Sequence, residues 1–181
     1  PLDGHAPGVR GKKLNAYVAA GPRSDHESTD PREALEKVRR GMMVFLREAT
    51  NARNLEDLLP MLTPENRRRV ALYTDDRQPP ELLADGGIDA MIRTVIQAGI
   101  SPVEAIRLAT LNPAEHFGLG DRGGLAPGRR ADLLIVEDLE ALTISAVYSG
   151  GSEVAKSGTP LAWKLPPATS PPAPSMRVRP E

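Results

Sequence analysis

The sequence contains no cysteine, which excludes disulfide bonds, thiolate metal ligands and a cysteine nucleophile. Aromatic residues make up only 3% of the 181 residues, so a core must be built from aliphatic side chains and methionine. The net charge is −1, which indicates neither a nucleic-acid partner nor an anionic membrane. No apolar run is long enough to cross a bilayer. We therefore expect a protein without nucleic-acid or membrane partners, and the lack of cysteine fits the cytoplasm.

Hydrophobic residues make up 40% of the chain, which is enough to build a core. From residue 14 to residue 119, helical and strand-like patterns alternate. A helix is predicted from Asp30, with Asp30 as N-cap, Pro31 at the first helical position and Glu33 as the capping-box acid. Such alternation is typical of an α/β fold with a parallel sheet and helices packed on it.

The other expected elements follow from apolar runs and spacing. Two runs have strand length, and one set of leucines and one isoleucine-rich stripe have helical spacing. Two further helices are expected where a polar cap precedes proline. The strand-length runs are Met42–Thr50 and Val70–Asp75. The leucine set is Leu55–Leu62, the isoleucine-rich stripe is Ile88–Ile96, and the two further helices are expected to start at the caps Ser101 and Asn112.

After residue 119 the pattern changes to short strands between Gly/Pro turns. Ala131–Val136 and Ile144–Tyr148 are predicted to form β-hairpin structure. The Pro-rich end is predicted to be extended or disordered. Three regions are therefore expected: an α/β region, a β region and a tail, at residues 1–119, 120–160 and 161–181.

Polar patches stand where three predicted strands end. His5 lies in "DGHAPG", His26 and Glu27 lie in "RSDHES", and Asp75 lies in "YTDDRQ". In parallel α/β folds, functional residues gather at the carboxyl ends of the strands. Imidazole and carboxylate ligands together suit Zn, Mn or Fe(II). If the strand continues to Asp75, alternation points Asp75 and Asp76 to opposite sides.

These motifs carry a family resemblance. "DGHAPG", "RSDHE" and "YTDDR", followed by "GIDAMIRTVIQAGISPVEAIRLATLNPAEHFGL" and "GGLAPGRRADLLIVEDL", resemble the adenine deaminase branch of the amidohydrolase superfamily. The similarity runs from the first residue to about residue 155. It implies a distorted (β/α)8 TIM-like barrel with a small β-sandwich. The implied reaction is metal-dependent hydrolytic deamination of adenine to hypoxanthine and ammonia.

The resemblance also implies roles for particular residues. His5 and His26 would be the metal ligands of the fifth and sixth barrel strands, and Asp75 that of the eighth. Glu27 would act as a proton shuttle or substrate contact, and Asp75 would accept a proton from the attacking water. The implied cofactor is a divalent metal, Mn or Fe(II) or else Zn, and the centre of the complete enzyme is binuclear.

One part of the implied site is absent from the sequence. The family's first strand carries a His-x-His pair, and no His-x-His occurs here. The third histidine, His116, falls within a predicted helix and is expected to be a packing or surface residue. We therefore expect the C-terminal half of the barrel followed by part of the β-sandwich. This half would need the missing N-terminal half, be inactive alone, and form a homo-oligomer when complete.

Two alternatives remain open at this point. The chain could come from another amidohydrolase, such as a deacetylase or a cyclic-amide hydrolase, because these share the barrel and the "APG..ADL" motif. It could also be a non-catalytic half-barrel that serves as an interaction module. Release of ammonia from adenine would separate a deaminase from the other amidohydrolases, and finding the missing strands encoded just upstream in the same frame would count against the interaction module.

Overall fold

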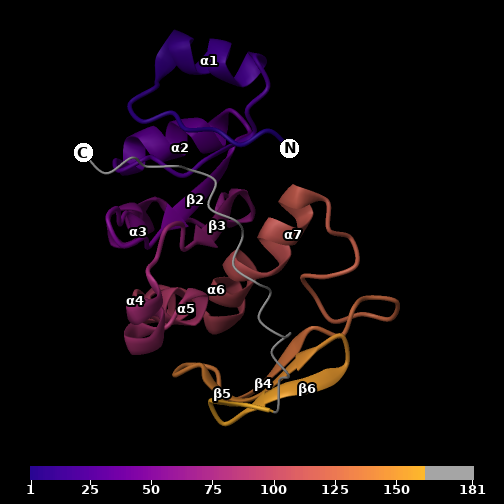
Figure 1. Ribbon diagram of the computed structural model, residues 1–181. Helices are drawn as coiled ribbons and strands as arrows, with labels where there is room; N and C mark the ends of the chain where they lie inside the picture. Colours follow the sequence, from indigo (N-terminus) through magenta and orange to yellow (C-terminus); the bar gives the residue numbers. More distant parts are fainter. Residues whose placement is uncertain (162–181) are drawn as a thin grey trace, which may run out of the picture.

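Residues 1–161 are described by a computed structural model and form two separate sheets, with helices packed on the first (Figure 1). The three strands of the first sheet lie among the helices, and the strands of the second sheet lie at the far end of the molecule. The expected α/β class is confirmed. The tail predicted for residues 161–181 lies, beyond residue 161, outside the described residues.

The first sheet is parallel, as predicted, with the strand order β1-β2-β3. All five residues of the central strand β2 are buried. A strand covered on both faces must be apolar nearly throughout, and all of its residues except Arg47 are apolar. An isolated parallel bridge between Leu2 and Pro22 extends the pairing on the β1 side. The strands are β1 (Ser24–Asp25), β2 (Met43–Arg47) and β3 (Val70–Tyr73).

Helices connect and cover these strands. The described helices are α1 (Gly11–Ala19), α2 (Pro31–Arg39), α3 (Leu55–Leu58), α4 (Pro79–Asp85), α5 (Ile88–Gln97), α6 (Pro102–Ala109) and α7 (Leu111–Phe117), with 3-10 turns η1 (Leu59–Met61) and η2 (Arg67–Arg69). The sequence patterns predicted α2, α5 and α6, placed the start of α7 two residues late, and missed α1 and α4. Of the leucines at helical spacing, two lie in α3, Leu59 begins η1 and Leu62 follows η1. The α-helix does not continue because Pro60 lacks the N–H that it needs.

The start of α2 confirms one predicted cap and corrects another. The Asp30 carboxylate accepts hydrogen bonds from the backbone N–H groups of Arg32 and Glu33, at 2.6 and 3.3 Å. The capping-box role predicted for Glu33 is wrong. Its carboxylate instead accepts hydrogen bonds from the Lys37 ammonium and the Gly8 backbone N–H, so it serves tertiary structure.

The core is aliphatic, as the low aromatic content requires. Its main cluster joins the face of β2 and β3 to helices α2, α3, α5 and α6. Leu142 and Val136, from the second sheet region, also pack against this cluster. The two sheets are therefore not independent, since they share part of one core.

The second sheet is antiparallel, with the order β4-β5-β6-β7, so the predicted hairpin structure is confirmed. Its strands are β4 (Leu133–Asp138), β5 (Thr143–Ser149), β6 (Ser152–Lys156) and β7 (Thr159–Pro160). Register shifts within β4–β5 and β5–β6 mark bulges, which bend a sheet locally.

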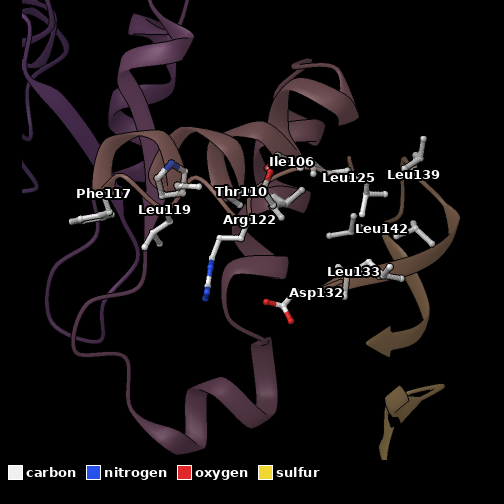
Figure 2. A pocket seen from close by; sticks show the side chains of 18 residues that line it. Ile106, Thr110, Phe117, Leu119, Arg122, Leu125, Asp132, Leu133, Leu139 and Leu142 are labelled. Carbon is white, nitrogen blue, oxygen red and sulfur yellow. The ribbon is translucent and has the colours of Figure 1, made fainter. Parts of the chain in front are cut away.

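An apolar groove separates this sheet from the helices (Figure 2). Its cavity volume is about 710 Å³, and its walls include Ile106 of α6, Phe117 of α7 and Leu133 of β4. Leu125, at one side, is 78% exposed.

Among residues 1–161, no helix is both long and apolar enough to cross a membrane.

Candidate metal centre

Three of the predicted site residues lie at the carboxyl ends of neighbouring parallel segments. His5 follows the segment that bridges to Pro22, and His26 and Glu27 come directly after β1. Because parallel segments end at the same edge of a sheet, side chains 21 positions apart in sequence are brought together. This edge is where the sequence predicted that functional residues would gather.

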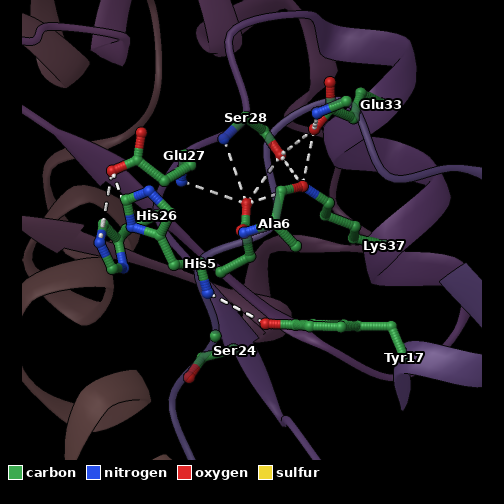
Figure 3. A network of polar contacts seen from close by, with 12 residues as sticks. His5, Ala6, Tyr17, Ser24, His26, Glu27, Ser28, Glu33 and Lys37 are labelled. Atoms are coloured by element: carbon green, nitrogen blue, oxygen red, sulfur yellow. Dashed lines mark hydrogen bonds and ion pairs between the residues drawn. The ribbon is translucent and has the colours of Figure 1, made fainter. Parts of the chain in front are cut away.

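His5, His26 and Glu27 form a compact group of donor atoms (Figure 3). Oε1 of Glu27 lies 3.5 Å from Nδ1 of His5 and 3.5 Å from Nε2 of His26. The two imidazole rings meet edge to face, with centroids 5.5 Å apart. One donor atom from each of the three residues lies within 4.8 Å of the others. The His5 side chain is 67% exposed, whereas those of His26 and Glu27 are mostly buried, so the group opens to solvent on the His5 side.

The donor set fits a divalent transition metal. Nδ1 of His26 is buried and has no hydrogen-bond partner within residues 1–161, and the nearby Oδ2 of Asp3 is 3.5 Å away. This nitrogen faces Asp3, whereas Nε2 of the same ring faces Glu27, so Nε2 is the His26 atom directed at the three-residue group. Two imidazoles and a carboxylate are ligands that Zn, Mn and Fe(II) accept.

Arg47 is a site residue that the sequence patterns did not identify. It is the last residue of β2, its side chain is 8% exposed, and it joins two of the predicted site carboxylates. Its Nη1 donates to Oε1 of Glu27 and, at 3.0 Å, to Oδ2 of Asp75, while Nη2 donates to Oε2 of Glu27 at 3.1 Å. Burial lowers the pKa of Arg47, but the hydrogen bonds and charges of Glu27 and Asp75 outweigh it and raise the pKa above its ordinary value. The signal in the sequence that could have identified Arg47 is a charged residue at the end of an otherwise apolar run.

Asp75 lies beside the three-residue group and not within it. Its Oδ2 accepts from Arg47, and its Oδ1 accepts from the Tyr73 hydroxyl at 3.3 Å. The Tyr73 ring packs against His26, with centroids 5.4 Å apart. Burial and the Asp75 charge raise the pKa of Tyr73, so its hydroxyl stays protonated and can donate. Asp75 is therefore linked to the group through two neighbouring side chains.

The strand argument that separated Asp75 from Asp76 was wrong. It assumed a strand through Asp75, but β3 ends at Tyr73, and Asp75 has φ +50°, in the left-handed region. Strand alternation therefore does not determine where the two side chains point. Asp76 is exposed, and its Oδ2 lies 3.5 Å from Nδ2 of Asn51.

His116 is a packing residue, as predicted. Its ring meets those of Phe45 and Phe117 edge to face, with centroids 5.8 and 4.9 Å away. Burial holds the pKa of His116 below its ordinary value, which favours the neutral ring. It lies in α7, and it is not one of the three residues whose donor atoms converge.

The chain is similar over nearly its whole length to curated adenine deaminases. It is 51% identical over 177 residues to the adenine deaminase of Desulfatibacillum aliphaticivorans, which covers 98% of this chain and 31% of that protein. It is 46% identical over 157 residues to that of Kosmotoga olearia, covering 87% and 27%. The chain thus spans less than a third of the length of these relatives.

Solved structures share its fold at lower identity. The β-aspartyl dipeptidase of Fervidobacterium islandicum superimposes with a TM-score of 0.68 at 20% identity, covering 91% of this chain and 48% of that one. The N-acetyl-D-glucosamine-6-phosphate deacetylase of Mycobacterium smegmatis gives 0.62 at 23% identity, covering 79% and 44%. The model of the amidohydrolase family matches residues 3–154. This match covers most of the sequence, and the chain belongs to the amidohydrolase family.

Proposed function

We propose that this chain carries part of the active site of a metal-dependent adenine deaminase. The observation that supports it most strongly is 46–51% identity to adenine deaminases. The convergence of His5, His26 and Glu27 at one sheet edge agrees with it. In the reaction, water adds to the purine carbon that bears the amino group, the carbon–nitrogen bond breaks, and hypoxanthine and ammonia leave.

The proposed roles follow from the contacts. His5 and His26 would hold a divalent metal, and Asp75 would be a further ligand. When bound, such a metal lowers the pKa of water and makes hydroxide available near neutral pH. Glu27, 3.5 Å from both imidazoles, is placed to take up a proton and pass it towards the leaving nitrogen. Arg47 holds both carboxylate oxygens of Glu27 and so fixes its orientation.

We propose that residues 1–119 form the C-terminal half of a (β/α)8 barrel and residues 120–160 part of a β-sandwich. The parallel order β1-β2-β3, the antiparallel order β4-β5-β6-β7 and the likeness to amidohydrolase structures support this division. The complete centre would be binuclear, with Mn, Fe(II) or Zn. It would also need the His-x-His pair, which this sequence does not contain.

A hybrid enzyme tests the function directly. In it, this chain replaces the matching segment of the D. aliphaticivorans adenine deaminase, and the purified protein is supplied with Mn²⁺, Fe²⁺ or Zn²⁺. We expect ammonia and hypoxanthine to appear in equal amounts from adenine. A folded, metal-loaded hybrid that releases no ammonia would contradict the proposal. Acetate release from N-acetyl-D-glucosamine-6-phosphate without adenine turnover would favour a deacetylase instead.

Single histidine variants of the hybrid test the metal roles. His5→Ala and His26→Ala should each lower bound metal and turnover together, because each removes a proposed ligand. His116→Gln is the matched control, since His116 packs against Phe45 and Phe117 and is expected to leave the metal content unchanged. Equal metal loss in all three variants would refute the assignment of His5 and His26.

A further inference from the structure

A fully buried lysine contacts the two segments that carry the proposed metal ligands. Lys37 of α2 has no exposed surface, and its ammonium makes four contacts. Nζ lies 2.7 Å from the Ala6 carbonyl oxygen, 2.9 Å from Oδ2 of Asp25, 2.9 Å from Oγ of Ser28 and 2.7 Å from Oε1 of Glu33. A buried charge is strongly unfavourable unless it is paired and hydrogen-bonded, and here the pairing is complete.

The network fixes the segment that carries His5. Ala6, the next residue, donates its backbone N–H to Oδ1 of Asp25 at 2.8 Å, and its carbonyl accepts from Lys37. Gly8 donates its N–H to Oε1 of Glu33 at 3.0 Å. The backbone that follows His5 is thus held by hydrogen bonds to Asp25, Lys37 and Glu33 (Figure 3).

The same groups fix the segment that carries His26 and Glu27. Oδ2 of Asp25, which contacts Lys37, also accepts from the backbone N–H groups of Glu27 and Ser28, at 3.2 and 3.1 Å. The Ser28 hydroxyl donates to the same oxygen at 2.9 Å. One carboxylate therefore holds the His5 segment through Oδ1 and the His26–Glu27 segment through Oδ2, and Lys37 holds that carboxylate.

We propose that Lys37 is a positioning residue that sets the separation of His5 from the His26–Glu27 pair. The relation to metal binding rests on the metal site proposed above. If the fold needed only a filled volume at this point, an apolar side chain would serve as well as a buried ion pair. Lys37 instead contacts the backbone one residue after His5 and the carboxylate that caps the turn after His26. Such supporting contacts orient ligands without touching the metal.

Lys37→Met in the 181-residue chain tests this, because methionine keeps much of the volume and removes the ammonium. We expect amide hydrogen exchange at Ala6, Glu27 and Ser28 to quicken at least tenfold more than exchange in β2 and β3. Zn²⁺ titrated by calorimetry should bind about 10–100-fold more weakly, the usual loss when ligand support is removed.

Two further variants separate positioning from general stability. Leu108→Ala truncates a fully buried side chain of α6 outside the network and should lower the melting temperature without changing either readout. Ser28→Ala is milder than Lys37→Met and should remain folded if that variant does not. It should weaken Zn²⁺ binding about fivefold, the scale of one hydrogen bond.

Opposite outcomes are equally clear. If Lys37→Met, or Ser28→Ala where it alone folds, lowers the melting temperature but leaves exchange and Zn²⁺ affinity within twofold of the parent, Lys37 is purely structural. If His5→Ala binds Zn²⁺ as tightly as the parent chain, the proposed metal site is wrong. Exchange at Ala6, Glu27 and Ser28 then still decides whether Lys37 holds the two segments together.

Discussion

Arg47 binds both Glu27 and Asp75, the two carboxylates of the proposed site, and its removal should have two opposite effects. In the metal-free protein, Arg47→Met leaves Glu27 and Asp75 without their shared cation. Removing one partner of a buried pair costs about 3–5 kcal/mol. Because the side chains of Glu27 and Asp75 are 16% and 30% exposed, water relieves part of this cost, and we expect about 2–4 kcal/mol. For a chain of this length that lowers the melting temperature by about 4–16 °C.

Metal binding should change in the other direction. In the parent, Arg47 donates to Oδ2 of Asp75, a proposed ligand, and to Oε1 of Glu27, which faces both histidines, so a cation bound there must compete with the guanidinium. In Arg47→Met that competition is gone, and a bound cation also neutralises the unpaired carboxylates. Ligand at 100 times its Kd stabilises a protein by about 2.7 kcal/mol, so tighter binding appears as a larger thermal shift. We expect Zn²⁺ to raise the melting temperature of the variant more than that of the parent.

Thermal melts with chelator and with saturating Zn²⁺, together with calorimetric titration, measure both effects. Arg93→Met is the control, since the Arg93–Asp89 pair is a half-exposed helix pair worth about 0.3–0.5 kcal/mol. If Arg47→Met has the same melting temperature as the parent in chelator, Arg47 does not compensate the charges of the two carboxylates. A smaller Zn²⁺ shift than the parent's would show that Arg47 organises Glu27 for metal and does not compete with it.

Four further results are expected. The 181-residue chain alone should release no ammonia from adenine in an enzyme-coupled assay, because its sequence has no His-x-His pair; turnover would contradict this. Leu46→Ala, in fully buried β2, should cost about 2–5 kcal/mol in urea unfolding. Burial raises the pKa of Asp89, but backbone amides and Arg93 lower it below its ordinary value. The stabilisation from the Asp89 carboxylate is therefore present above the ordinary carboxyl pKa and is lost as pH falls. Asp89→Asn should accordingly show a weaker dependence of unfolding on acid pH. In the hybrid enzyme, Asp75→Asn should lower turnover and bound metal at least about tenfold more than the exposed Asp76→Asn, and the reverse order would assign the role to Asp76.

The elements that could be predicted from the sequence are those whose local signal agrees with their packing. β2 and β3 are continuous apolar runs because both faces are covered, and α5 shows a full helical stripe because one face packs on the core. Prediction failed where a tertiary contact overrides a local rule. Glu33 stands at a capping-box position but pairs with Lys37, and its role depends on a loop that local sequence does not place beside it.

The site was predictable in part for the same reason. His5, His26 and Glu27 follow strand-like segments, so the parallel topology alone brings them to one edge. Arg47 was not predictable in its role, because its partners Glu27 and Asp75 lie 20 and 28 positions away and depend on which strands are neighbours. Sequence spacing locates the ends of strands, whereas the pairing of long side chains between those ends requires the fold.

The formal charges at this edge are compatible with the proposed divalent cation. Asp3 and Glu27 each lie 3.5 Å from a nitrogen of His26. The Arg47 guanidinium pairs with Glu27 and with Asp75. With neutral imidazoles, the formal charges of these three carboxylates and Arg47 sum to −2, and water screens part of this charge because Asp3 and Asp75 are 52% and 30% exposed. A divalent ion carries the charge that would balance it, and imidazoles are ligands only when neutral. The Lys37 network cannot supply this charge, because its ammonium is already committed to Asp25 and Glu33. A net negative charge of this size is therefore what the proposed divalent metal would balance.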